Sequence, residues 1–153
     1  MTSSDLKGQL TKKQEFNGFG CSGENISPQL SWENAPKGTK SFAITVYDLD
    51  VPTGSGWWHW VVFDIPSNKT TLVSGFGNSD SKGAIQSITD YGKTGFGGAC
   101  PPVGDKAHRY IFTVHALDIE TLGLDKNTNA ATVGYYINSH SIAKASIISY
   151  YNR

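Results

Sequence analysis

The stretch Lys40-Ser41-Phe42-Ala43-Ile44-Thr45-Val46-Tyr47-Asp48 decides the fold, because apolar side chains occupy every second position along it. Phe42, Ile44 and Val46 fall on one face of an extended segment, which is the pattern of a half-buried β-strand. Asp48 continues the same parity at the end of the segment. We therefore predict a strand that packs one face against a core and carries a carboxylate at its rim.

Two further stretches alternate in the same way. Trp58-His59-Trp60-Val61-Val62-Phe63-Asp64-Ile65 predicts a second strand, which Pro66 ends, and residues 108–117 predict a third. Residues 29–32 and 84–88 give weaker strand signals. From Asn129, a good N-cap residue, apolar positions recur every three or four residues as far as Ile147, with a break near residues 138–141. We therefore expect a single domain, residues 1–153, of the mostly β class: an antiparallel β-sandwich with a C-terminal helical element.

The composition argues against several classes of protein. Thirteen Lys plus Arg balance thirteen Asp plus Glu, so a nucleic-acid-binding surface is not expected. No stretch approaches the roughly 18 apolar residues of a membrane helix, and the first residues do not form a hydrophobic signal segment. We therefore expect a cytoplasmic protein without integral membrane contact. Cys21 and Cys100 lie far apart in glycine-rich loops; two free thiols are the default expectation, and a disulfide is the alternative.

The predicted strands bring polar residues to one end of the sheet. If the first two strands pair as a hairpin, Asp48 and His59 become neighbours in space, and His108 and Tyr110 at the start of the third strand can reach the same rim. Imidazole, phenol and backbone N–H groups all donate hydrogen bonds to phosphate or carboxylate oxygens. We therefore expect a small anion-binding pocket at this rim.

Other histidines and other chemistries are less well supported. His115 has the opposite parity to His108, and His140 lies on the apolar stripe of the predicted helix, so neither is expected in the site. His59, His108 and an aspartate, Asp48 or Asp50, are the residue types of an iron or zinc site, but none of them has the spacing of a local metal motif. No activated nucleophile is recognisable. We expect no metal, no cofactor and no enzymatic activity, and retain a hydrolase or metal-dependent enzyme as the alternative.

Three ordered blocks resemble the signature of the phosphatidylethanolamine-binding protein family. They are Tyr47-Asp48-Leu49-Asp50-Val51-Pro52, Gly56-Trp57-Trp58-His59-Trp60-Val61-Val62 and Pro101-Pro102-Val103-Gly104-Asp105-Lys106-Ala107-His108-Arg109-Tyr110. Residues 25–32 and 112–118 are similar to its bacterial and archaeal Raf-kinase-inhibitor-like branch. The resemblance implies a β-sandwich with a cavity for phosphate, phosphoethanolamine or acetate. It also implies a set of ligand-binding positions: Asp48, Asp50, Pro52, Trp58, His59, Pro101, Pro102, His108 and Tyr110.

The resemblance also implies partners. It suggests a non-catalytic protein that recognises a phospholipid headgroup or a phosphoprotein and modulates a kinase or a protease. Bacterial members of the family are often dimers, and an apolar helix stripe around His140 would suit a homodimer. Only two arginines, Arg109 and Arg153, are present, so anion recognition is expected to depend on histidine, tyrosine and backbone donors.

Overall fold

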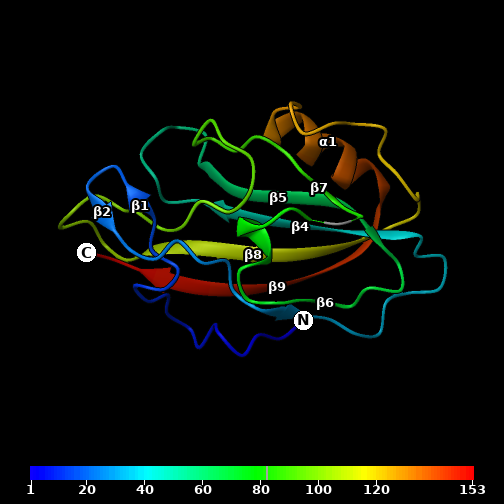
Figure 1. Cartoon of the computed structure of the whole chain (residues 1–153), viewed down its shortest axis with the longest axis horizontal. Coiled ribbons are helices and arrows are strands. Elements are labelled where there is room, and N and C mark those ends of the chain that lie inside the picture. The colour runs from blue at the N-terminus through cyan, green and yellow to red at the C-terminus, as the bar shows by residue number, and fades with distance from the viewer. Residues whose placement is uncertain (82) are drawn as a thin grey trace.

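Figure 1 shows a computed structural model of the chain, which describes residues 1–81 and 83–153. Its centre is a five-stranded antiparallel sheet in the order β7-β5-β4-β8-β9. The strands of this sheet are β4 (Ser41–Asp48), β5 (Trp57–Pro66), β7 (Ile85–Gln86), β8 (His108–Leu117) and β9 (Ser141–Tyr151). The three strands predicted from alternation are therefore confirmed, and β4 lies between β5 and β8.

A second, smaller layer covers one face of the main sheet. It contains β3 (Leu30–Ser31), which pairs with β6 (Thr71–Leu72), and a short 3-10 helix, η1 (Phe76–Asn78). Phe42, Ile44 and Val46 pack in the larger core together with Leu30 and Leu72 of the small sheet. The β-sandwich is therefore confirmed. The weak strand signals near residues 30 and 85 correspond to strands of only two residues each, β3 and β7.

Helix α1 (Ala130–His140) covers the opposite face of the sheet. Its side chains Val133 and Ile137 are fully buried against a second core cluster that includes Val61 and Phe63 of β5. The predicted N-cap is confirmed, because the Asn129 side chain accepts a hydrogen bond of 2.9 Å from the backbone N–H of Thr132.

The predicted continuation of the helix beyond residue 140 is wrong. Ser141 begins β9, which pairs antiparallel with the whole of β8. Ala143 and Ile147 therefore lie on a strand, whose Ile- and Tyr-rich sequence favours extended structure. His140 does not pack on an apolar stripe either, since its Nδ1 atom lies 2.9 Å from the Asp118 carboxylate at a half-exposed helix end.

The expectation of two free thiols is also wrong, because Cys21 and Cys100 form a disulfide. Cys21 belongs to β2 (Cys21–Ser22), which forms a small hairpin with β1 (Asn17–Gly18), and Cys100 precedes the loop that leads into β8. Their Cα atoms are 6.0 Å apart, within the usual range for a disulfide. The bridge joins the N-terminal hairpin to the chain beside the predicted site.

Candidate functional site

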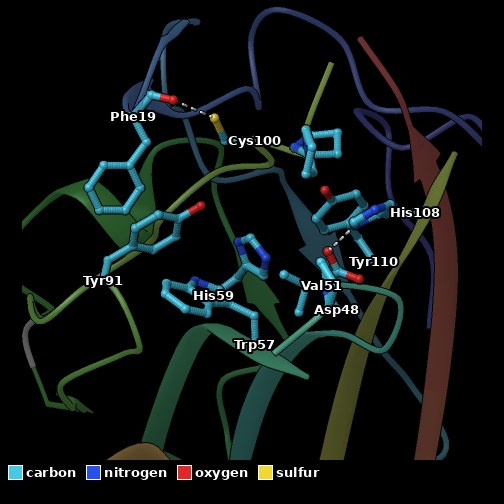
Figure 2. Close-up of a pocket in the computed structure, with 12 residues that line it drawn as sticks. Phe19, Asp48, Val51, Trp57, His59, Tyr91, Cys100, His108 and Tyr110 are labelled. Carbon is cyan, nitrogen blue, oxygen red and sulfur yellow. Dashed lines mark hydrogen bonds and ion pairs between the residues drawn. The ribbon is translucent and has the colours of Figure 1, made fainter. Parts of the chain in front are cut away.

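A cavity of about 200 Å³ lies where β4 ends and where β5 and β8 begin (Figure 2). In the sheet, Asp48 pairs with Trp57 on one side and with Tyr110 on the other, which brings the three strand ends together. The lining combines two histidines, one carboxylate, two tyrosines and several apolar groups: Phe19, Asp48, Val51, Pro52, Trp57, His59, Tyr91, Cys100, Pro101, Pro102, His108 and Tyr110.

Asp48 and His108 form a buried pair in this cavity. The Asp48 side chain is almost fully buried, and its Oδ2 atom lies 2.8 Å from His108 Nδ1. Its Oδ1 atom accepts a hydrogen bond of 2.8 Å from the backbone N–H of Asp50. His108 Nε2 is 3.4 Å from the half-exposed carboxylate of Asp105. These contacts fix both the carboxylate and the imidazole plane before any ligand binds.

His59 is held by a loop of two glycines. Its Nδ1 atom lies 2.8 Å from the carbonyl oxygen of Gly97 and 3.1 Å from that of Gly98. Because carbonyl oxygens only accept hydrogen bonds, Nδ1 carries the proton, and Nε2 is left for a ligand. A Cβ atom at Gly97 would lie 2.3 Å from the Tyr91 ring, so glycine is required here. Burial lowers the pKa of His59, while the Gly97 carbonyl and the Asp48 charge oppose that shift.

Two hydrogen-bond donors of the lining have no partner. The Tyr110 hydroxyl and the Trp57 indole N–H are both buried and unpaired within the described part of the chain. Burial, together with the nearby Asp48 charge, raises the pKa of Tyr110, so its phenol keeps the proton. Both groups are therefore free to donate to a ligand acceptor.

The opposite wall consists of aromatic rings and the disulfide. Tyr91 stacks on Phe16 with ring centroids 4.1 Å apart, and its hydroxyl donates to the Gly98 carbonyl at 2.8 Å. The disulfide ties the hairpin that carries Phe19 to Cys100, which directly precedes Pro101 and Pro102 in the chain. The Arg153 guanidinium strengthens this junction, because it donates to the carbonyls of Pro101 and Gly20 at 2.7 and 2.9 Å.

Most residues expected in the pocket line this cavity, but Asp50 and Trp58 do not. Asp50 accepts hydrogen bonds from the Arg109 guanidinium at 2.7 and 2.9 Å, and these bonds lower its pKa to about 2. Trp58 packs toward α1 and Tyr47, with the Tyr47 and Trp58 ring centroids 4.7 Å apart. Successive side chains of a strand point to opposite faces, so Trp57, not Trp58, shares the face of His59.

Several lining residues were not expected. Trp57 could have been found from its parity with His59 on β5. Phe19 and Tyr91 lie in loops whose sequence has no periodic pattern, and Cys100 reaches the cavity through the disulfide. In contrast, His115 lies on the other face of the sheet, as its parity predicted, where its Nε2 atom is 3.2 Å from the Thr45 hydroxyl.

The lining suits the binding of a small polar group. It offers two unpaired donors, an imidazole nitrogen and one carboxylate. It contains no serine, and its cysteine sulfur is part of the disulfide. Among residues 1–81 and 83–153, no three His, Cys, Asp or Glu side chains form a group suited to a metal ion.

Comparison with known proteins places this sandwich and its cavity in one family. Residues 6–152 match the sequence model of the phosphatidylethanolamine-binding proteins, and the chain belongs to this family. It is 49% identical to UPF0098 protein YbhB of Escherichia coli K12, with 99% of both chains covered. It is 51% identical to UPF0098 protein YbcL of the same organism, with 99% of this chain and 86% of that protein covered.

Two solved structures resemble the fold closely. The crystal structure of E. coli YbcL, described as a new member of the mammalian PEBP family, superposes with a TM-score of 0.97 and covers 99% of this chain and 96% of that one. The structure of CT736 from Chlamydia trachomatis, described as a putative PEBP homologue, has a TM-score of 0.82 at 29% identity, with 99% and 95% of the two chains covered. The family and fold expected from the three sequence blocks are therefore confirmed.

Proposed function

We propose that the protein is a non-catalytic binding protein that holds a small anionic group, a phosphate or a carboxylate, in the cavity of Figure 2. One observation carries this proposal: the Tyr110 O–H and the Trp57 N–H are buried donors without a partner in the part of the chain that the structure describes. Leaving a buried donor unpaired costs about 1–3 kcal/mol. Ligand oxygens that accept from these groups recover that free energy.

The Asp48 carboxylate sets a condition on the ligand. A second negative charge beside a buried carboxylate is unfavourable unless a positive charge offsets it. His59 supplies that charge when its Nε2 atom takes up a proton, since Nδ1 is already protonated. The cavity therefore suits a small anion that binds together with one proton. A phosphate on a lipid headgroup and a free phosphate share this chemistry, and modulation of a kinase or a protease remains a prediction.

Titration followed by histidine NMR tests the proposal. Inorganic phosphate, phosphoethanolamine and acetate at millimolar concentration should shift the ring signals of His59 and His108 in a saturable way. His115 is the internal control, because it lies on the other face of the sheet and should not shift. Sedimentation with phosphatidylethanolamine vesicles then distinguishes a lipid headgroup from a free phosphate as the source of the anion.

Tyrosine variants separate binding by the cavity from binding elsewhere. Tyr110→Phe removes one unpaired donor and should weaken anion binding about 5- to 10-fold. Tyr150→Phe is the matched control, since Tyr150 is 43% exposed and lies outside the cavity, and its affinity should equal that of the wild type. Absence of any shift at His59 and His108 contradicts the proposal. Release of free phosphate from phosphoethanolamine, seen by ³¹P NMR, would point to the hydrolase alternative.

The Cys21–Cys100 disulfide argues against the predicted cytoplasmic location. In the described residues no helix is long and apolar enough to cross a bilayer. The Cys21–Cys100 bridge, however, is typical of proteins from oxidising compartments, because the cytoplasm keeps thiols reduced. Alkylation of free thiols at the moment of cell lysis tests the location: unmodified cysteines would indicate an oxidising compartment.

A further inference from the structure

Helix α1 covers only part of its face of the main sheet (Figure 1). It packs over β5, where Val61 and Phe63 are fully buried. Toward the β9 edge the same face is open, and Ile148 is 45% exposed. A groove of about 240 Å³ lies beside the helix on this face, and residues of β4, β5, β8, β9 and α1 line it. None of its described lining residues belongs to the cavity of Figure 2, so the groove is a separate feature of the fold.

His115 lines this groove and has one ring nitrogen without a partner. The residue is only 6% exposed, and its Nε2 atom lies 3.2 Å from the Thr45 hydroxyl. Its Nδ1 atom is buried and unpaired within the described part of the chain. Burial, with the Lys144 charge nearby, lowers the pKa of His115 to about 4, so the imidazole is neutral at pH 7 and carries a single N–H. A buried polar atom of this kind costs free energy until an added group pairs with it.

The Thr45 hydroxyl indicates which nitrogen of His115 carries the proton. If the Thr45 O–H donates to Nε2, only the Nδ1–H is left without a partner. If Nε2 donates instead, both the Thr45 proton and the Nδ1 lone pair are left unpaired among residues 1–81 and 83–153. The first arrangement leaves fewer buried groups unpaired, so the proton is assigned to Nδ1. His115 therefore presents a donor that lacks an acceptor.

The groove also has a cation and an aromatic wall. Lys144 lies directly opposite His115 in the pairing of β9 with β8, and its ammonium group forms no ion pair in the part of the chain that the structure describes. No aspartate or glutamate is among the described lining residues. Trp58 and Ile137 provide apolar surface, and Gly134 lets the Trp58 ring lie against α1, since a Cβ atom there would be 3.0 Å from the ring. The groove thus combines a buried donor and a positive charge with an aromatic surface.

We propose that this groove is a second ligand site, which takes a small aromatic carboxylate. One carboxylate oxygen accepts from the His115 Nδ1–H, the other lies beside the Lys144 ammonium, and the ligand ring packs on Trp58. Pockets for drug-sized ligands measure roughly 300–1,000 Å³, so this smaller groove suits a ligand with a single ring. Because Nδ1 is buried, a side chain must move to admit the ligand, and Lys144, exposed on a flexible stem, can make this movement.

The proposal does not depend on the proposed function of the cavity, and different histidines report on the two sites. Acetate and inorganic phosphate lack a ring to pack on Trp58, so they are not expected to bind beside His115. The ring signals of His59 and His108 report binding in the cavity, and those of His115 report binding in the groove. A ligand that enters only one of the two sites is therefore recognised directly.

NMR of the full chain with benzoate tests the second site. Benzoate should shift the His115 ring signals and the Trp58 indole signals in a saturable way, with a millimolar dissociation constant. Benzamide has the same shape without the charge and should bind about 2- to 5-fold more weakly. Acetate at the same concentration should leave the His115 signals unchanged.

Two matched pairs of variants test the contacts. Lys144→Met removes the charge and should weaken benzoate binding about 2- to 5-fold while benzamide binding stays the same, and Lys37→Met, in an exposed loop outside the groove, should have no effect. Asn138→Trp places a large ring at an exposed position that lines the groove and should weaken benzoate binding by about 10-fold or more. Ser139→Trp, at the next exposed position outside the groove, should bind benzoate as the wild type does.

Circular dichroism and the unfolding midpoint confirm that each variant is folded. His115 signals that stay unchanged up to about 20 mM benzoate would overturn the proposal. Equal benzoate affinity of wild type and the Lys144→Met variant would overturn it as well, because the charge would then have no part in binding. An equal response of His115 to acetate and to benzoate would exclude an aromatic ligand as the specific occupant.

Discussion

Replacing both Cys21 and Cys100 by serine should lower the free energy of unfolding by about 3–4.5 kcal/mol. The bridge joins positions that are 79 residues apart, and the entropy of closing a loop of that length in the unfolded chain corresponds to about 4.5 kcal/mol at 25 °C. The native state should change little, because the Arg153 guanidinium still holds Pro101 and Gly20 together. The loss therefore arises mainly from the greater freedom of the unfolded chain.

Guanidinium unfolding followed by tryptophan fluorescence measures this effect. With a slope of about 4 kcal/mol per molar denaturant for a chain of this size, the midpoint should fall by about 1 M. Reductant should lower the midpoint of the wild type by the same amount and leave the serine variant unchanged. A fall of less than about 0.2 M, or two reactive thiols in the native, unreduced protein, would refute the reasoning.

His59, His115 and Asp50 each make binding or stability depend on pH. Acetate binding should weaken as the pH rises, because burial lowers the pKa of His59 in the free protein and a bound anion raises it. Calorimetry in two buffers should detect proton uptake on binding at pH 7. Binding without proton uptake would contradict the role of His59. Burial, with Lys144 nearby, lowers the pKa of His115 from 6.5 to about 4, so between these pH values the unfolded chain binds more protons than the native one. The free energy of unfolding should therefore fall by about 3 kcal/mol as the pH is lowered from 6.5 to 4. That fall should be much smaller in His115→Gln, and an equal fall refutes the role of His115. The Arg109 hydrogen bonds lower the pKa of Asp50 from 3.8 to about 2, so their stabilisation is present above pH 3.8 and is lost toward pH 2. Asp50→Asn should lower the free energy of unfolding in urea by only about 1 kcal/mol at pH 7, because the Asp50–Arg109 pair is partly exposed. The loss of stability with falling pH should also be shallower in this variant. An unchanged acid transition would refute the role of Asp50.

The central strands could be predicted because they are short runs rich in β-branched and aromatic residues, although both of their faces are buried over most of their length and not one face only. Phe42, Ile44 and Val46 define β4 without ambiguity, and the same pattern defines β5 and β8. β9 could not be predicted in this way. Its apolar residues, such as Ala143 and Ile147, also fit a helical spacing, and its exposure on both faces removes the alternation that marks a half-buried strand.

Much of the polar centre of the site could be predicted, because Asp48, His108 and Tyr110 share the parity of the apolar core face at one end of the sheet. His59 could be predicted from its place at a strand end, but its parity is that of Val61 and Phe63, which pack on the helix side. It lies on the cavity face because the register of β5 shifts beside it, and no local pattern reports that shift.

The rest of the site depends on loops. Tyr91 reaches the cavity because the Gly97 backbone allows close packing, and nothing in the local sequence reports that contact. The disulfide likewise depends on a distance between two loops that no local pattern encodes.

The central position of β4 determines when the cavity can form during synthesis. β4 and β5 make a local hairpin that can form early, but the bond between Asp48 and His108 joins residues 60 positions apart. Contacts of such long range are slow to form, because the intervening chain must first be ordered. A nascent chain that ends before His108 therefore exposes the core face of β4 and carries no site. Ligand binding can begin only after β8 has left the ribosome and has paired with β4 of the hairpin.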